Sequence, residues 1–343
     1  MIADEDPACC GSGCTNCVLD SKPSKHILPT GVSSVFDRTY KPFTCASIKQ
    51  ETEDVFRFKF RYESTASHDE IRDKHRYVII PHGCHLFLRM LKSATPPIGS
   101  AADNLLHAWR EKHTVQIAAR GYFAEQSNTV EKYDKNEADL YFSRPYTPIS
   151  FDTNEGTFDV LIKMEPGGRM TEYLLTLMVG SGTQWKGVYG DFVWKRSQYR
   201  EVVAFVQGVA IAPVYSTMRA ILDDEEDDTR LMLCGCFRNL QNVLLRDELR
   251  AMAAYWNFKY AIYLSRRSCT CLLGSECGCV AKPIKYNEPI YDRRLEAADV
   301  ERLLMPLSER KHSLLVLLCG TESFIALIKT SLEKLRIEHC YTF

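Results

Sequence analysis

The chain has 343 residues, of which 45% are hydrophobic and 25% are charged, and its formal net charge is −1. This composition is that of a globular protein with about two domains, and the near-zero charge gives no basis for a nucleic-acid partner. No apolar run is as long as a membrane span, and the start MIADEDPACC lacks the apolar core of a signal peptide. We therefore expect a cytoplasmic protein without a membrane span, and a location inside an organelle remains open.

Two short clusters contain eight of the 14 cysteines. The clusters are Cys9, Cys10, Cys14 and Cys17 near the start, and Cys269, Cys271, Cys277 and Cys279 in CTCLLGSECGC. Clustered thiols in a long chain without a signal favour reduced thiols or metal ligands over disulfides. Zinc or an iron–sulfur centre remains open at the first cluster, where adjacent cysteines are awkward joint ligands, and a thiolate clip or a surface loop remains open at the second. No metal ligand is therefore assigned.

Residues 1–35 are rich in Cys, Gly, Ser and Pro and predict a small module with a linker. From residue 36 to residue 198, short stretches with turn signals between them predict the strands of an antiparallel barrel or sandwich. The expected strands are residues 54–62, 76–90, 113–123, 156–164 and 190–195, and the expected loops are 93–104 and 128–139. One stretch, residues 167–177, has helical spacing instead.

Beyond residue 198 apolar runs alternate with helical patterns. The expected strands are residues 201–211, 230–237, 259–265 and 313–320, and the expected helices are 213–222, 242–256, 293–304 and 322–335. Continuous apolar strands that alternate with helices predict a doubly wound parallel α/β domain over residues 199–343.

The stretch RPYTPIS, residues 144–150, combines charged, aromatic and hydroxyl side chains with two prolines. Proline excludes a helix there and favours an extended chain at a sheet edge or strand end. Alternation along an extended chain then places one set of side chains on a single side, namely Arg144, Tyr146, Pro148 and Ser150. That set suits a ligand with a phosphate at one end and a flat ring at the other, although a strand end that faces water would have the same residues.

Three further stretches lie where ligands of such domains bind. QGVAIAP, residues 207–213, joins a strand to a helix, and CGTESF begins at Cys319 where the last long strand ends. Two glycines precede the helix of GGRMTEYL, where backbone amides could hold a diphosphate. Each stretch alone is also explained without a ligand, as a plain loop with Thr171 near a helix start or as a buried core thiol.

In order, the stretches RPYTPIS, DVLIKM, GGRMTEYL, WKGVYGDFVW, GVAIAP and LLCG resemble the NADH-cytochrome b5 reductase group of the ferredoxin–NADP reductase superfamily. The resemblance begins at about Asp37 and continues to the C-terminus, and the N-terminal cysteine cluster is similar to an oxidoreductase-like module found before some of these reductases. It implies an FAD-binding β-barrel over residues 36–198 and an NAD-binding domain over residues 199–343.

The resemblance also implies roles for individual residues. Arg144 would contact the FAD pyrophosphate, Tyr146 would pack on the isoalloxazine ring, and Thr147 and Ser150 would supply hydroxyls nearby. The remaining FAD segments would be Ile162, Lys163 and Met164, followed by Gly168, Arg169, Met170 and Thr171. On the NADH side the implied residues are Gly208, Pro213, the candidate catalytic Cys319, Gly320 and the C-terminal Phe343.

The chain departs from the family pattern at several of these positions. The family loop G-T-G-I-T-P reads here as GVAIAP, so Val209, Ala210 and Ala212 replace two threonines and a glycine. Glu165 stands where the family has an aromatic residue, and Thr321 follows Cys319-Gly320 where the family has proline. We expect a reductase that passes electrons from NADH through FAD to a one-electron acceptor, such as cytochrome b5 or another haem protein. The alternative is a flavin-binding or metal-binding interaction protein with little turnover.

Overall fold

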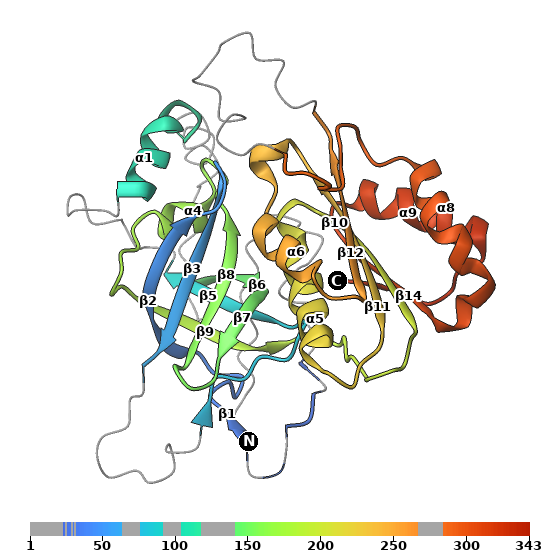
Figure 1. The fold of residues 1–343 in the computed structure, drawn as a ribbon. Helices are drawn as coiled ribbons and strands as arrows, with labels where there is room; N and C mark the ends of the chain where they lie inside the picture. The colour runs from blue at the N-terminus through green and yellow to red at the C-terminus, as the bar shows by residue number, and fades with distance from the viewer. Residues whose placement is uncertain are drawn as a thin grey trace, which may run out of the picture. The chain divides into compact units, whose positions relative to one another are not determined.

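The computed structural model describes residues 23–24, 26–28, 30, 32–63, 76–91, 104–117, 141–266 and 284–343. The chain divides into two compact units, Met1–Asp191 and Phe192–Phe343, called here the N-terminal and C-terminal units (Figure 1). The narrower domain limits expected from the sequence, 36–198 and 199–343, stay a prediction.

The N-terminal unit is built on a seven-stranded sheet whose pairs are all antiparallel, with the order β6-β5-β9-β2-β3-β8-β7. Its strands are β2 (Lys41–Gln50), β3 (Val55–Tyr62), β5 (His85–Leu91), β6 (Tyr141–Tyr146), β7 (Pro148–Asp152), β8 (Thr157–Lys163) and β9 (Gly182–Tyr189). The other elements are the short parallel pair β1 (Ser33–Ser34) and β4 (Arg76–Tyr77), with the helices α1 (Asn104–Lys112) and α4 (Arg169–Leu174).

The two edge strands of this sheet, β6 and β7, are consecutive in the chain and are joined by Thr147 alone. Because one residue spans only about 3.5 Å, the sheet must curl until its two edges meet at Thr147. The two prolines of RPYTPIS therefore lie on edge strands, as the sequence predicts, where a missing N–H breaks no central ladder.

Aromatic rings fill the inside of the curled sheet. Phe158 packs against Phe43, Phe60 and Trp185, with ring centroids 5.2, 5.6 and 5.1 Å away. Helix α1 adds Leu106 and Trp109 to the same core, and both side chains are buried. The indole N–H of Trp109 donates to Asp54 Oδ1 at 3.2 Å, so α1 is attached to the β2–β3 turn as well.

Several predictions for this unit are confirmed and two are wrong. Residues 54–62 and 156–164 contain β3 and β8, and 167–177 contains α4; the stretch 76–90 forms strands only in its first two residues and from His85 on. Residues 113–117, predicted as a strand, are helical instead: the Ile117 N–H donates to the His113 carbonyl, and residues 118–123 lie outside the described residues. Residues 190–195 form no strand, because β9 ends at Tyr189 and the connection between the units follows.

The C-terminal unit is a six-stranded parallel sheet with the order β13-β12-β11-β10-β14-β15. Its strands are β10 (Glu201–Gln207), β11 (Arg230–Phe237), β12 (Phe258–Leu264), β13 (Ile290–Tyr291), β14 (Leu314–Cys319) and β15 (Cys340–Thr342). Its helices are α5 (Ile211–Asp223), α6 (Arg246–Met252), α8 (Ala297–Leu304) and α9 (Glu322–Leu335), with the 3₁₀ segments η3 (Gly208–Ala210), η4 (Leu240–Asn242) and η6 (Met305–Ser313).

Helices cover this parallel sheet on both faces, with α5 and α6 on one and α8 and α9 on the other (Figure 1). Side chains from alternate positions of β10, such as Val203 and Phe205, pack with Val300 of α8 and Ile328 of α9. The residues of β10 that alternate with these, Val202, Ala204 and Val206, are buried as well. The predicted fold class, an antiparallel β-sheet domain before a doubly wound parallel domain, is therefore confirmed.

Candidate functional site

In the N-terminal unit two strand edges diverge from Thr147. β7 pairs with the first part of β8, from Asp152↔Thr157 to Pro148↔Val160. The rest of β8, residues 161–163, pairs only with β3 among the described strands, so its other edge is open. β6 pairs only with β5 in the same part of the chain, yet β6 and β8 contact each other. The unit thus presents two neighbouring strand edges that no described strand pairs, and RPYTPIS forms one of them.

Arg144 and Tyr146 lie on the same side of β6, as the alternation predicts. They pair across the ladder with Leu88 and Leu86, both buried core residues, and cross-strand partners face the same side of a sheet. The Tyr146 ring meets Trp185 edge-on, with centroids 6.0 Å apart. Burial raises the pKa of Tyr146, an effect that the nearby Arg144 charge partly opposes, so the phenol is neutral at physiological pH.

Ser150 does not share that side, which corrects the prediction. A bulge between Pro148 and Ser150 shifts the β7–β8 register, so that Ser150 lies opposite Asp159 rather than the core residue Phe158. The Ser150 hydroxyl is exposed and donates to Asp159 Oδ2 at 2.9 Å. One extra residue in the strand is enough to turn this side chain outward.

The second edge carries the predicted segment Ile162-Lys163-Met164. Ile162 and Met164 are each 1% exposed and belong to the core, so only their backbone could meet a ligand. Lys163 is exposed and forms an ion pair with Glu165, the residue that replaces the family's aromatic. The structure therefore leaves one cationic side chain of this segment on the surface.

A tight turn leads from β8 into α4. The Gly168 N–H donates to the Glu165 carbonyl at 2.9 Å, and the Thr171 hydroxyl accepts the Glu165 N–H at 2.9 Å. Gly167 has a φ of 72°, and a Cβ on Gly168 would lie only 3.0 Å from the Glu165 oxygen. Both glycines are thus required by the turn. Arg169 and Met170 begin α4, with Arg169 exposed and Met170 buried.

In the C-terminal unit the chain reverses its winding direction between β10 and β14. Strands β11, β12 and β13 follow β10 outward on one side, whereas β14 and β15 pair on the other. Ligands of open α/β sheets bind at the carboxyl ends of the strands at such a switch point. Gly208, with a φ of 58°, starts η3 directly after β10, and the buried Pro213 lies in the first turn of α5.

Three predicted residues meet at the carboxyl end of β14. Cys319 is its last residue, and burial raises the pKa of the thiol to about 12. Gly320 follows, and a Cβ there would lie 2.7 Å from Phe324 Cδ1. The Phe343 N–H donates to the Leu318 carbonyl at 3.0 Å, and the Phe343 ring packs on Phe192 at a centroid distance of 5.0 Å.

Gln207 lies in the candidate stretch 207–213, but sequence reasoning assigned its side chain no role at this switch point. Its side-chain oxygen accepts from the Thr321 backbone N–H at 3.2 Å and from the Thr321 hydroxyl at 2.9 Å. The two residues are 114 positions apart, and only the pairing of β10 with β14 brings them together. A local motif could not have revealed this contact.

Both cysteine clusters lie outside the described residues. Among the residues that the structure does describe, no group of three or more His, Cys, Asp or Glu side chains is placed to hold a metal ion. A search of the same residues for a helix long and apolar enough to cross a bilayer found none.

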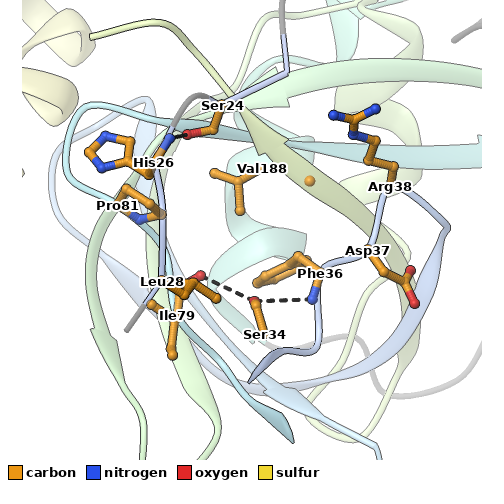
Figure 2. A pocket seen from close by; sticks show the side chains of 11 residues that line it. Ser24, His26, Leu28, Ser34, Phe36, Asp37, Arg38, Ile79, Pro81 and Val188 are labelled. Atoms are coloured by element: carbon orange, nitrogen blue, oxygen red, sulfur yellow. Dashed lines mark hydrogen bonds between the residues drawn. The ribbon is translucent and has the colours of Figure 1, made fainter. Parts of the chain in front are cut away.

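A cavity of about 230 Å³ opens in the N-terminal unit, away from every predicted site residue (Figure 2). Figure 2 shows Val188 pointing into it, with Phe36 and Ile79 on its walls. The Ser34 hydroxyl bonds the Ile79 carbonyl and the Phe36 N–H, and the Ser24 hydroxyl accepts the His26 N–H. These hydroxyls are therefore already used within the wall, and we assign no ligand to the cavity.

Two family profiles match the chain. The oxidoreductase FAD-binding domain family matches residues 132–194, and the oxidoreductase NAD-binding domain family matches residues 206–270. A human protein named NADH-cytochrome b5 reductase-like is 34% identical over 186 residues, which is 54% of this chain and 55% of the relative. NADH-cytochrome b5 reductase 1 of Arabidopsis thaliana is 31% identical over 120 residues, covering 35% and 43%. The chain thus spans about half the length of the human relative, or less for the plant protein.

Solved structures agree on the fold. The cytochrome b5 reductase domain of Ulva prolifera nitrate reductase superposes with a TM-score of 0.56 at 20% identity, over 91% of this chain and 100% of that one. A ferredoxin NADP+ reductase from Neisseria gonorrhoeae gives 0.54 at 12% identity, over 89% and 98%. The chain is therefore a two-domain protein with the fold of ferredoxin–NADP reductases, parts of which match the oxidoreductase FAD-binding and NAD-binding families in that order, and it is similar in sequence to NADH-cytochrome b5 reductases.

Proposed function

We propose that the protein is an FAD-dependent NADH reductase that delivers electrons singly to a haem protein such as cytochrome b5. The observation that carries the proposal is the pair of strand edges at Thr147, which bears Arg144 on one side and Lys163 with the glycine turn on the other. This arrangement lies inside the segment similar to FAD-binding domains.

The residues present fit an FAD. The turn requires glycine at Gly168, because a Cβ there would crowd the Glu165 carbonyl, and a turn without side chains at Gly167 and Gly168 would let a diphosphate approach its backbone. Arg144 would bind the diphosphate with its planar cationic fork, and Tyr146 would place an aromatic ring against the flavin. The hydroxyl of Thr147, at the point where the edges diverge, would orient the ring. Ser150 contributes less than the sequence suggests, because it faces away from Tyr146 and bonds Asp159.

When bound, FAD accepts two electrons from NADH and releases them one at a time, so the protein itself supplies binding, orientation and exclusion of water. We place NADH at the switch point of the C-terminal unit, where Gly208 and the first turn of α5 would receive its diphosphate. Cys319 and Gly320 would lie beside the nicotinamide, and Phe343 would cover this site until the ring enters. Burial raises the pKa of the Cys319 thiol to about 12, so the side chain would be a neutral thiol there. The cytoplasmic location expected from the sequence stays a prediction.

Anaerobic stopped-flow mixing of the purified, FAD-loaded protein with NADH tests the proposal. The flavin absorbance should bleach within seconds, and adding oxidised cytochrome b5 should restore it. A flavin that stays oxidised for minutes contradicts the reductase function, and a folded protein that remains colourless with excess FAD contradicts the flavin site.

A further inference from the structure

Gln207 forms a bridge across the switch point of the C-terminal unit. It ends β10, and its side-chain oxygen receives both the backbone N–H and the hydroxyl of Thr321, which immediately precedes α9. Its Cβ would lie 3.0 Å from a Cβ built on Gly320, so the side chain runs close across that glycine. Gln207 and Thr321 are both exposed.

The chemistry of this bridge resembles that of the expected ligand. A glutamine side chain ends in a primary carboxamide, and here the carboxamide oxygen is held by two donors from one residue. The nicotinamide ring of NADH carries the same primary carboxamide. A ligand that enters at the carboxyl ends of β10 and β14 therefore meets donors that an internal carboxamide already occupies.

We propose that Gln207 is an internal competitor of the nicotinamide: its carboxamide occupies the donor pair of Thr321 that would otherwise receive the carboxamide of NADH. This inference deepens the proposed NAD site and rests on it. The bonds to Thr321 are exposed to water, so a ligand can replace them at modest cost, and Gln207 reduces affinity without closing the site. The effect is confined to ligands that carry a nicotinamide, because ADP-ribose has no carboxamide to compete.

Calorimetric titration of the full, FAD-loaded chain with NAD+ and with ADP-ribose tests the inference. Gln207→Ala should bind NAD+ about three- to tenfold more tightly than the wild type, since one hydrogen-bonded competitor is removed. Binding of ADP-ribose should stay within about twofold. Gln198→Ala is the matched control, an exposed glutamine that precedes the amino end of β10, and it should change neither affinity.

Two further variants separate the hydrogen bonds from the bulk of the side chain. Gln207→Met keeps a side chain of similar length without an acceptor and should also tighten NAD+ binding. In a Thr321→Val background one of the two donors is gone, so the gain from Gln207→Ala should shrink, which a double-mutant cycle measures as coupling.

Each outcome decides the matter. Unchanged or weaker NAD+ binding by Gln207→Ala overturns the inference, and so does tightening by Gln207→Ala but not by Gln207→Met, because bulk rather than the carboxamide would then be responsible. If NAD+ and ADP-ribose bind neither the wild type nor any variant, the proposed NAD site itself fails. That result is distinct from a failure confined to Gln207, in which ADP-ribose still binds.

Discussion

The two units of the protein bury different kinds of side chain. Inside the curled sheet of the N-terminal unit, Phe43, Phe60, Phe158 and Trp185 pack ring against ring. The parallel sheet of the C-terminal unit is filled mainly by aliphatic residues, as in the strand LLVLLC of β14. Large rings fill the enclosed face of the curled sheet, whereas strands that helices cover on both faces are typically rich in Val, Ile and Leu.

This difference also determines where polar chemistry is placed. In the N-terminal unit the candidate ligand groups lie on strand edges and in the turn before α4, because the enclosed face is already filled with rings. In the C-terminal unit they lie beyond the strands, because both faces of the strands are covered. The candidate ligand groups of each unit are therefore supported by that unit's own core, and the strongest test of the comparison is to damage one core alone.

Phe158→Ala should have the largest effect. Phe158 is 1% exposed and contacts four other rings of the core, so its truncation should cost about 3–5 kcal/mol of the free energy of unfolding. Denaturant unfolding followed by fluorescence should show the transition of the N-terminal unit at a lower denaturant concentration. Leu317→Ala, in the core of the other unit, should instead shift the second transition. Equal shifts of both transitions in either variant would show that the two cores are not separate.

Asp299→Asn should have the next largest effect, and it should depend on pH. The Asp299 carboxylate is 3% exposed and bonds Arg293 and Arg302, and the hydrogen bond from Arg293 chiefly holds its pKa below the usual 3.8. A depressed folded pKa gives stability that is present above about pH 4 and is lost as the pH falls through the folded pKa. The variant should therefore lose about 2 kcal/mol in urea unfolding at pH 7.

The difference between Asp299→Asn and the wild type should narrow when the same unfolding is repeated below pH 4. Asp228→Asn, at an exposed carboxyl, is the control and should unfold like the wild type throughout. A difference that remains constant from pH 7 to pH 3 would mean that the charge of Asp299 contributes nothing.

Most long elements of the C-terminal unit could be predicted, whereas the short strands β13 and β15 and the segment η6 were missed. The stretches 230–237 and 322–335 coincide with β11 and α9, because continuous apolar runs and helical periodicity are unambiguous there. Three predicted spans are too long. The strand 201–211 ends at Gln207, where η3 begins, and the helix 293–304 begins only at Ala297. The helix 242–256 shrinks to α6, which Leu245, in the left-handed region at φ 55°, precedes and which ends at Met252. Local patterning was enough for β10, β11, β12 and β14, because most residues of these strands are buried.

The N-terminal unit was harder to predict, for reasons visible in its residues. β2 and β9 were missed because KPFTCASIKQ and GTQWKGVY mix polar residues with single large rings, so neither shows clear alternation. The outward turn of Ser150 depends on a bulge that no local pattern announces. In the other unit, the Gln207–Thr321 contact joins residues 114 positions apart. Contacts of this kind depend on which strands become neighbours, and no local pattern in the sequence shows the strand order.

Arg144→Ala tests the ligand groups rather than the cores. If the guanidinium binds the diphosphate, its loss should weaken FAD binding roughly ten- to hundredfold, as expected for a charge-assisted bond. The FAD affinity of Arg144→Lys should fall between those of the wild type and Arg144→Ala, because lysine keeps the charge and loses the planar fork. Fluorescence titration of the apoprotein with FAD measures the change. Arg61→Ala, at an exposed arginine of β3, serves as the control, and unchanged affinity in Arg144→Ala would remove Arg144 from the site.

The smallest expected effect is at Cys319, the candidate catalytic residue. Because burial raises the pKa of its thiol to about 12, Cys319 should remain protonated up to pH 9 and should react slowly with iodoacetamide, which peptide mass analysis detects. Cys319→Ala should then slow flavin reduction less than tenfold and leave its profile between pH 7 and pH 9 unchanged. If the wild-type rate of flavin reduction changes with pH near pH 8, and this change is absent in Cys319→Ala, a thiolate takes part. That result would exclude the proposed role of Cys319 as a neutral thiol beside the nicotinamide.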